Sequence, residues 1–302
     1  MMKPINLAAI DIGSNGARLL VKRFDESEPE FDKIRKLMYI RVPLRLGKDV
    51  FTLGKISKER EEMMIEMMKG YKHFMKLNNV ARYRACATSA MRDAENGKKV
   101  IKHIRKATGM ELEIIPGQQE AQLLCNNILE QSNSKKGNFA YVDVGGGSTE
   151  ISLLHDGKLT ESCSYNCGTL RMLSGKVGKD TIVRMKRMLS NYAAEHGEVQ
   201  IIGSGGNINR LFRLSNDKTK GKVFSLEELQ RLYLKLKPLS IEERMEQFGL
   251  KEDRSDVIIP AAEIFLIVAD ALNCKSILVP NISLADSIVD GLYSEICEKG
   301  GA

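Results

Sequence analysis

The sequence carries one glycine-rich pattern twice, at residues 8–20 (AAIDIGSNGARLL) and at residues 140–154 (AYVDVGGGSTEISLL). Each copy is a short apolar run ending in Asp, a hydrophobic residue, a glycine-rich turn with a Ser, and a second apolar run. Asp11 and Asp143 hold equivalent places, 143 − 11 = 132 residues apart. Two strand–loop–strand units of this kind predict a chain built from two similar α/β halves.

The two glycine-rich turns have the composition of anion-binding loops. Glycine lets the backbone turn with positive φ and approach a ligand closely, and successive N–H groups then form a nest for an anion. The first turn, taken alone, suits phosphate binding and an ordinary hairpin equally. The second turn favours phosphate binding, because three consecutive glycines cost more backbone entropy than a hairpin requires. The candidate phosphate-binding residues are Asp11, Gly13, Ser14, Asn15, Arg18, Gly145, Gly146, Gly147, Ser148 and Thr149.

Three carboxylates accompany these turns. Asp143 directly follows an apolar strand and suits Mg²⁺, which prefers carboxylates, waters and phosphate oxygens. Glu150 closes the second turn, and Glu120 begins a predicted helix after a Pro-Gly pair. A carboxylate within hydrogen-bond reach of a water can orient and deprotonate it for attack on a phosphoanhydride. Glu120 and Glu150 are therefore the candidate catalytic residues, and stabilisation of a helix N-terminus is the alternative explanation for Glu120.

A third glycine-rich turn (GSGGN) lies between a predicted strand at 199–202 and a predicted helix at 207–214. It lacks the third glycine of the dinucleotide pattern G-x-G-x-x-G, and the absence of G-x-x-x-x-G-K-[ST] excludes a P-loop fold. A turn that opens a helix can bind an anion, and a plain strand-to-helix turn fits these residues equally. The candidate nucleotide-binding residues are Gly203, Ser204, Gly205, Gly206 and Asn207.

The composition limits the kinds of partner. A net charge of +7 over 302 residues suits a polyanion. The absence of Trp and an aromatic content of 6% argue against base stacking, so no nucleic-acid partner is expected. The N-terminal apolar stretch is too short for a signal sequence, and charges within residues 261–272 exclude a membrane span there. Six Cys without a CxxC pair indicate reduced thiols in a cytoplasmic protein.

Apolar strands alternate with amphipathic helices along the chain, which predicts an α/β fold. The polar stretch at 131–138 is the best candidate linker, and Ser57 is a candidate N-cap. Strands are expected at 5–24 (a hairpin around 13–16), 31–46, 80–87, 111–115, 139–154, 157–164, 199–202 and 276–280. Helices are expected at 57–77, 89–108, 118–131, 179–196, 207–214, 225–236, 240–247, 256–272 and 283–298.

Motifs along nearly the whole chain occur in the order and spacing of a known family. They are IDIGSN and RL within 10–19, ATSAMRDAENG at 87–97, PGQQEAQLL at 116–124, DVGGGSTEI at 143–151, IIGSGGNINRL at 201–211, RSDVIIPAAEIF at 254–265 and ISLADSIVDGLYSE at 282–295. In these motifs the chain resembles the exopolyphosphatase/guanosine-pentaphosphate phosphohydrolase (Ppx/GppA) family of the actin-like ATPase superfamily. The resemblance implies two ribonuclease-H-like domains, each with a mixed sheet flanked by helices, and an active site in the cleft between them. The expected domains are residues 1–124 and 125–302, with packing of the last helix on the first domain as an alternative.

The resemblance also implies Mg²⁺-dependent release of terminal phosphate, with Mn²⁺ as an alternative metal. Glu120 matches the family's water-activating carboxylate, and Asp143 and Glu150 match its acidic pair at the phosphate and the metal. Arg92, in ATSAMR, falls beside the cleft and on a candidate substrate contact. The residues that fall on phosphate contacts of the first turn are Asp11, Ser14, Asn15 and Arg18.

The chain departs from the family pattern at a few places. Gly16 stands where the family usually has Ser, and Gln119 stands where it usually has Glu. The turn at 203–207 replaces the usual Gly-Thr-Gly-Gly-Thr. The chain is also expected to be a short form, without the extra C-terminal helical domains of the long members.

Four functions fit these observations. The leading hypothesis is an exopolyphosphatase acting on inorganic polyphosphate, and the second is a guanosine pentaphosphate phosphohydrolase of the stringent response. A third is an actin-like ATP-binding kinase or filament protein. A fourth is a nucleotide-sensing module without turnover, motivated by Gln119 and the turn at 203–207. The sequence leaves open the substrate preference, the chain length, the metal, the extent of domain closure and the oligomeric state, with a homodimer among the alternatives.

Overall fold

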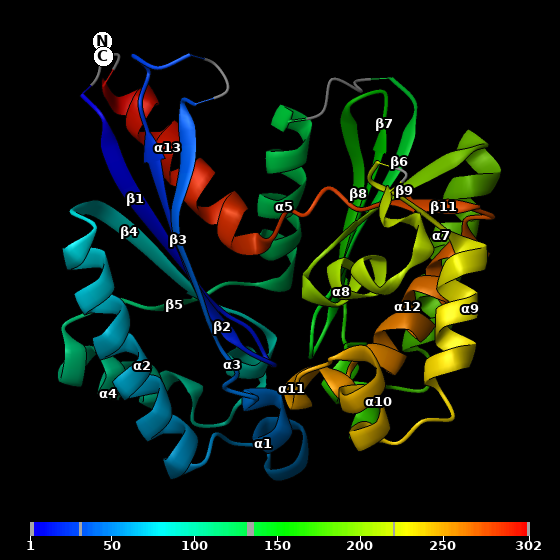
Figure 1. The fold of residues 1–302 in the computed structure, drawn as a ribbon, viewed down its shortest axis with the longest axis horizontal. Coiled ribbons are helices and arrows are strands. Elements are labelled where there is room, and N and C mark those ends of the chain that lie inside the picture. The colour runs from blue at the N-terminus through cyan, green and yellow to red at the C-terminus, as the bar shows by residue number, and fades with distance from the viewer. Residues whose placement is uncertain (1–2, 30–31, 132–135, 220, 301–302) are drawn as a thin grey trace. The chain divides into compact units, whose positions relative to one another are not determined.

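The computed structural model describes residues 3–29, 32–131, 136–219 and 221–300. Contacts divide the chain into two compact units, which are Met1–Pro116 with Leu284–Ala302 and Gly117–Ser283. The boundary expected at 124/125 falls inside α5 (Gly117–Gln131), which belongs to the second unit. Each unit is built on its own mixed sheet (Figure 1).

The first unit holds a five-stranded sheet in the order β3-β2-β1-β4-β5. The central strand β1 pairs antiparallel with β2 and parallel with β4. The strands are β1 (Ile5–Ile12), β2 (Ala17–Phe24), β3 (Ile34–Val42), β4 (Val80–Ala87) and β5 (Glu113–Ile114). The helices are α1 (Leu46–Leu53), α2 (Lys58–Leu77), α3 (Ser89–Asp93), α4 (Gly97–Thr108) and α13 (Leu284–Gly300).

The second unit holds a six-stranded sheet in the order β10-β11-β9-β6-β7-β8. Its strand β6 pairs antiparallel with β7 and parallel with β9, which repeats the arrangement around β1. The strands are β6 (Asn138–Val144), β7 (Thr149–His155), β8 (Lys158–Tyr165), β9 (Val199–Ser204), β10 (Val223–Ser225) and β11 (Ser276–Leu278). The helices after α5 are α6 (Thr169–Leu173), α7 (Thr181–His196), α8 (Gly206–Leu214), the 3₁₀ turn η1 (Asn216–Thr219), α9 (Leu226–Leu236), α10 (Ile241–Phe248), α11 (Glu252–Ser255) and α12 (Ile258–Ala271).

The two faces of the β6–β7 hairpin have different partners. Side chains alternate between faces along a strand, and one face joins the core of the second unit through Ala140, Val142, Val144, Ile151 and Leu153. The opposite face carries Asp143 and Glu150. The helix α5 contacts β7 and β8, and the hydroxyl of Ser152 donates to the Ala121 carbonyl at 3.5 Å. Because Ser152 shares a face with Glu150, α5 covers the polar face.

Most of the expected elements are confirmed, including the hairpin at 5–24 and the Ser57 cap, whose side chain accepts from the Arg60 N–H. The single helix expected at 89–108 is wrong, because α3 and α4 are separate helices. The chain folds back between them so closely that a Cβ on Gly97 would lie 2.4 Å from the Met91 carbonyl oxygen. The short helix α1 and the short helix α6 were not expected.

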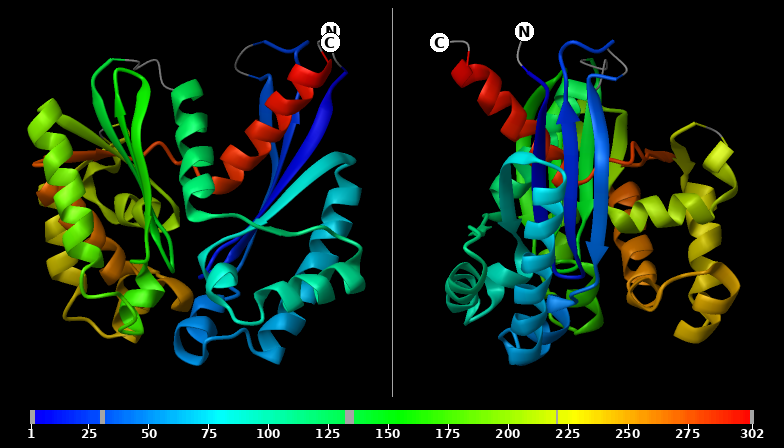
Figure 2. Two further views of the ribbon diagram at one scale, coloured as in Figure 1. Left: turned by 180° about the vertical axis from the view of Figure 1, so that it is seen from behind. Right: turned by 60° about the vertical axis from the view of Figure 1, so that its left-hand side comes forward.

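The last helix, α13, lies against β1, β2 and β4 of the first sheet (Figure 2). Lys22 on β2 is 4% exposed, and its Nζ lies 2.7 Å from Asp290 Oδ1 and 3.2 Å from Asp286 Oδ1 of α13. A buried ammonium needs compensating charge, so these carboxylates tie the C-terminal helix to the sheet formed by the start of the chain.

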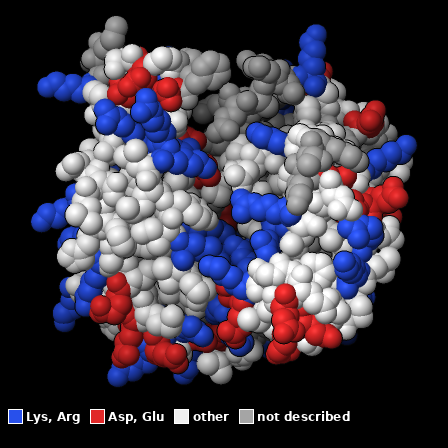
Figure 3. Space-filling model, viewed as in Figure 1, with Lys and Arg blue, Asp and Glu red and all other residues white. Residues whose placement is uncertain are grey.

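Lys and Arg side chains are distributed over both units, with Asp and Glu between them, on the face that Figure 3 draws. Within the described residues, no helix has both the length and the apolarity needed to cross a membrane. The described cysteines are free. Burial raises the pKa of the Cys125 and Cys167 thiols to about 11, so both are neutral at pH 7.

Candidate functional site

The first glycine turn is held from one side by α1. The Arg45 N–H donates to the Asn15 carbonyl at 3.0 Å, and the Gly47 N–H donates to the Ser14 carbonyl at 2.8 Å. In a trans peptide the N–H points away from the C=O. The N–H groups of Asn15 and Gly16 therefore point away from α1, in the direction from which an anion could approach.

The side chains of the first turn are also suited to a ligand. Ser14 is 2% exposed, and its Oγ has no hydrogen-bond partner within the described residues. A buried hydroxyl without a partner carries a desolvation cost that a bound phosphate would relieve. The Gly13 N–H closes the turn on the Gly16 carbonyl at 3.2 Å. A Cβ on Gly16 would lie 2.9 Å from the Val42 carbonyl oxygen, so the close approach of β3 explains glycine there.

The second glycine turn is built in the same way, with α6 in place of α1. The carbonyls of Gly145, Gly146 and Gly147 all accept hydrogen bonds from the segment that begins α6. The donors are the N–H groups of Thr169, Leu170 and Arg171 and the Nε of Arg171. By the same peptide geometry, the N–H groups of Gly146, Gly147 and Ser148 point away from α6. Three consecutive N–H groups on one side have the geometry of an anion nest, and phosphate binding by this turn stays a prediction.

Two residues that support this turn were missed by sequence reasoning. A Cβ on Gly168 would lie 2.5 Å from the backbone of Gly147 and Ser148, so only glycine allows α6 to dock. Arg171 is 8% exposed, and its Nε donates to the Gly147 carbonyl at 2.6 Å, which places a cation beneath the turn. The repeated strand–turn–strand pattern could have indicated both residues, because α1 and α6 each follow the third strand of their unit.

The hydroxyls of the second turn already have protein partners. Ser148 Oγ donates to Glu150 Oε1 at 2.6 Å. Thr149, which is fully buried, donates its hydroxyl to the Cys167 carbonyl. In this structure the Ser148 and Thr149 side chains therefore support Glu150 and α6, and the groups of the turn that face away from α6 are backbone N–H groups.

Four polar residues stand in register across the second sheet. Asp143 on β6 is paired with Ser204 on β9 and with Glu150 on β7, and Glu150 is paired with Ser164 on β8. Paired residues on neighbouring strands project from the same face of a sheet, and in the two antiparallel pairs their Cβ atoms lie about 4.5–5.5 Å apart. We call Ser204, Asp143, Glu150 and Ser164 the polar row. Two carboxylates stand side by side at its centre, an arrangement that a bound cation would stabilise.

The helix α5, which carries Glu120 in its first turn, contacts β7 and β8, the strands that carry Glu150 and Ser164. Glu120 is 6% exposed and Glu150 is 2% exposed. Ala121, next to Glu120, contacts Ser152, which is two residues beyond Glu150 on the same face of β7. Both candidate catalytic glutamates are thus buried, and the backbone next to Glu120 contacts the strand that carries Glu150.

The equivalent row of the first unit has the opposite charge. Asp11 is paired with Arg18 on β2 and with Cys86 on β4, and Arg18 is paired with Arg41 on β3. The Arg18 guanidinium forms an ion pair with Asp11, which is 2% exposed. Burial raises the pKa of the Cys86 thiol, so it is neutral. This row sums to one positive charge and suits a phosphate, and Arg41 is a member that the sequence did not single out.

The carboxylates of the polar row fit a hard divalent cation. Among the described residues, no group of three or more His, Cys, Asp or Glu side chains is arranged as a metal site. Mg²⁺ does not require three protein ligands, because it is commonly held by one or two carboxylates with waters and phosphate oxygens. Ser204 is 1% exposed, and its Oγ has no hydrogen-bond partner in the described part of the chain. This buried hydroxyl, next to Asp143, leaves a hydrogen-bonding position open for a polar ligand.

The turn at 203–207 joins β9 to α8, and each of its glycines meets a neighbour. A Cβ on Gly203 would contact the core at 2.9 Å, one on Gly205 would lie 2.4 Å from Asp143 Oδ1, and one on Gly206 would lie 2.6 Å from the Arg254 guanidinium. The side chain of Asn207 accepts from Arg254 Nη1 at 3.1 Å. Nucleotide binding by this turn stays a prediction.

Arg92 lies on α3, and its Nη1 donates to the Ile115 carbonyl at 2.9 Å. This hydrogen bond holds the segment that joins β5 to α5 against α3.

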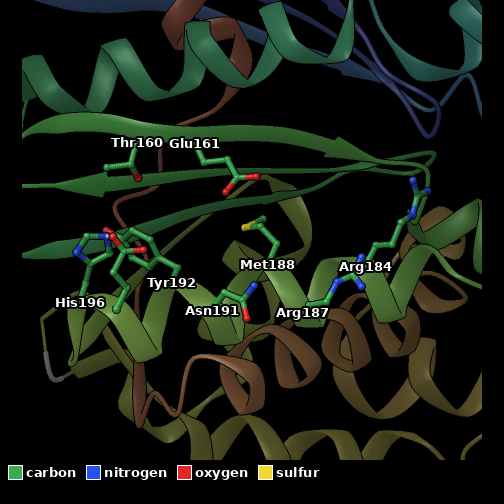
Figure 4. A pocket seen from close by; sticks show the side chains of 9 residues that line it. Thr160, Glu161, Arg184, Arg187, Met188, Asn191, Tyr192 and His196 are labelled. Atoms are coloured by element: carbon green, nitrogen blue, oxygen red, sulfur yellow. The ribbon is translucent and has the colours of Figure 1, made fainter.

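A groove of about 490 Å³ lies between β8 and α7 (Figure 4). Its lining includes Glu161, Arg184 and Tyr192, and none of the predicted site residues is among the described residues that line it.

Comparison with known proteins assigns the chain to a family. Residues 25–295 match the model of the Ppx/GppA phosphatase family. The chain belongs to the Ppx/GppA phosphatase family. The resemblance carried by the sequence motifs is thereby confirmed.

Curated relatives of this Ppx/GppA chain carry two different names. Exopolyphosphatase 1 of Mycobacterium tuberculosis is 31% identical over 151 residues, which are 49% of this chain and 42% of that protein. Guanosine-5'-triphosphate,3'-diphosphate pyrophosphatase of Aeromonas salmonicida is 23% identical over 298 residues, which are 94% of this chain and 59% of that protein. The chain spans about half the length of the curated relatives it matches.

Solved structures of Ppx/GppA proteins share the fold over nearly the whole chain. The Aquifex aeolicus family member aligns with a TM-score of 0.74 at 24% identity, over 98% of this chain and 99% of that chain. An exopolyphosphatase from Cytophaga hutchinsonii aligns with a TM-score of 0.83 at 22% identity, over 96% of this chain and 98% of that chain. The expected fold class, α/β with two mixed sheets flanked by helices, is confirmed.

Proposed function

We propose that the chain is an exopolyphosphatase, which uses a divalent cation, Mg²⁺ or Mn²⁺, to release terminal phosphate from inorganic polyphosphate. The observation that supports this most directly is the polar row beside the second glycine turn. Two opposed carboxylates suit a cation, and three N–H groups directed away from α6 suit an anion. A substrate that brings phosphate and a divalent cation together satisfies both.

In this proposal each part of the second unit has a distinct task. The N–H groups of Gly146, Gly147 and Ser148 hold phosphate oxygens, and Asp143 and Glu150 hold the cation. When bound, the cation neutralises phosphate charge and stabilises the charge that develops on the leaving oxygen. Arg171 adds positive charge beneath the turn. In the first unit, the positively charged row that contains Arg18 binds phosphate groups.

Glu120 is the proposed general base. Its carboxylate accepts a proton from a water whose oxygen bonds to the terminal phosphorus, while the bond from that phosphorus to the bridging oxygen breaks. The products are orthophosphate and a chain one phosphate shorter. Burial of Glu120 at 6% exposure limits competing solvent contacts and favours a fixed orientation of the carboxylate.

Guanosine pentaphosphate is the second candidate substrate. The Aeromonas relative, whose name refers to such a nucleotide, matches 94% of this chain. The chemistry at the cleaved phosphoanhydride would be the same, so the two candidates differ in what holds the rest of the substrate. A nucleotide-binding protein without hydrolysis remains the alternative from another class.

The test compares substrates side by side. Phosphate release by the purified chain is measured on short polyphosphate, long polyphosphate, guanosine pentaphosphate and ATP, each with Mg²⁺, with Mn²⁺ and with EDTA. We expect metal-dependent release from polyphosphate and none in EDTA. Faster release from guanosine pentaphosphate would assign the second function. Tight ATP binding without any release would replace both with a nucleotide-binding role.

A further inference from the structure

Ser164 is an exposed residue on β8, the edge strand of the second sheet, and its hydroxyl reaches a buried carboxylate. Ser164 Oγ donates to Glu150 Oε1 at 2.8 Å, and Ser148 Oγ donates to the same oxygen at 2.6 Å. Hydrogen bonds to an ionised carboxylate are short and directional. Two donors on one oxygen therefore restrict rotation of the Glu150 carboxylate.

The two donors anchor Glu150 to different parts of the molecule. Ser148 belongs to the glycine turn, and a change in that turn on ligand binding would carry its hydroxyl along. Ser164 belongs to a strand paired with β7 over its length, so its position is set by the sheet. Ser164 also ends the polar row, on the far side of Glu150 from Asp143.

We propose that Ser164 is a positioning residue, which holds the Glu150 carboxylate in the orientation that binds a divalent cation together with Asp143. This inference rests on the proposed function in one respect, that Glu150 is a metal ligand. Hydrogen-bond partners of metal ligands fix the orientation of the ligand, and their removal typically weakens metal binding by about 10–100-fold. Ser164 acts on the cation only through Glu150.

The strand offers a matched control two residues away. Ser162 lies on the same face of β8, and its Oγ lies 3.1 Å from Ser152 Oγ rather than at a carboxylate. Ser162→Ala and Ser164→Ala therefore remove the same group from the same edge strand. Ser164→Thr keeps a hydroxyl and suits a strand, so it tests whether the hydrogen bond is what matters.

The experiment titrates Mg²⁺ calorimetrically, and Mn²⁺ by electron paramagnetic resonance, into the full chain and these variants. Thermal melts without metal show that each variant is folded. We expect Ser164→Ala to weaken metal binding by roughly tenfold or more. Ser164→Thr should restore most of the affinity, and Ser162→Ala should bind as the wild type does.

The outcomes separate this inference from the proposed function. If the wild type binds metal and Ser164→Ala binds it equally well, the positioning role is overturned and the metal site stands. Equal losses of metal affinity in Ser162→Ala and Ser164→Ala would show that any weakening of β8 has this effect. That result would also overturn the positioning role of Ser164. If the wild type binds neither cation, the proposed metal site fails, and this inference fails with it.

Discussion

Asp143 on β6 stands directly opposite Glu150 on β7, at the register position where Asp11 faces Arg18 in the other unit. The first pair is an ion pair, and the second consists of two like charges. The same strand–turn–strand frame therefore occurs in two electrostatic forms. One form suits an anion, and the other suits a cation.

This relationship predicts unequal stability effects at equivalent positions. In EDTA, Asp143→Asn removes one of two opposed carboxylates and should lower the free energy of unfolding by no more than about 1 kcal/mol. Asp11→Asn leaves the Arg18 guanidinium without its carboxylate and should lower that free energy by about 2–3 kcal/mol. Urea unfolding of the three proteins measures both changes.

Added Mg²⁺ extends the same comparison. A ligand that binds only the folded state stabilises it in proportion to the logarithm of its concentration. Mg²⁺ should therefore raise the melting temperature of the wild type and of Asp11→Asn but not that of Asp143→Asn. An equal rise in all three proteins would contradict metal binding by the polar row.

Glu120→Gln tests the general base. The amide keeps the size of the side chain but cannot accept the proton, so turnover should fall by roughly 10²–10⁴-fold. Stability should change by no more than about 1 kcal/mol, the size of a helix N-terminal charge effect. Steady-state phosphate release and circular dichroism melts supply the two measurements. A near-wild-type rate would remove Glu120 from the mechanism.

Gly168→Ala tests the docking of α6 against the second turn. The added Cβ would lie 2.5 Å from backbone atoms of Gly147 and Ser148, which cannot move aside as a side-chain end could. We expect a loss of about 1–3 kcal/mol in the free energy of unfolding. Activity should fall further than this loss explains, because the N–H groups that we propose to bind phosphate would shift.

Gly70→Ala is the matched control for that substitution. Gly70 lies inside α2, and a Cβ there would meet nothing within 4 Å. Alanine should stabilise the helix by about 0.5–1 kcal/mol without affecting phosphate release. If Gly168→Ala behaved like Gly70→Ala, the close docking of α6 would be disproved.

Cys167 predicts a decline of stability in alkali. Burial raises the pKa of its thiol from 9.0 to about 11, so between these pH values the unfolded chain has lost a proton that the folded chain keeps. The free energy of unfolding must then fall as pH rises through this window, by up to about 1.4 kcal/mol for each pH unit per thiol of this kind. Urea unfolding of wild type and Cys167→Ala at pH 8 to 11 measures it. Parallel curves for the two proteins would refute this assignment.

Local patterns were sufficient for most of the secondary structure. Alternation of apolar residues predicted the hairpins, and the Ser57 cap with its apolar periodicity predicted α2. The helix expected at 89–108 failed because its break depends on Gly97 contacting the Met91 carbonyl, a contact that periodicity does not encode. The short helices α1 and α6 escaped notice because five to eight residues carry too little periodicity to detect.

The candidate site shows the same division. The sequence was sufficient to identify the glycine-rich turns, the acidic residues and the family. Glycines and carboxylates at fixed spacing indicate phosphate and metal binding directly. Ser164, Arg41, Gly168 and Arg171 were not, because their roles come from strand register and from contacts between segments far apart in the chain.

The amino-acid sequence alone thus determined that the chain has two units with the same strand–turn–strand pattern. It also determined which residue types could bind phosphate and metal. Only tertiary structure decided which carboxylates oppose each other, which side of each turn presents its N–H groups, and which hydroxyls hold Glu150. The physical reason is that turn composition acts locally, whereas hydrogen-bond direction and charge pairing are settled only when strands align and short helices dock.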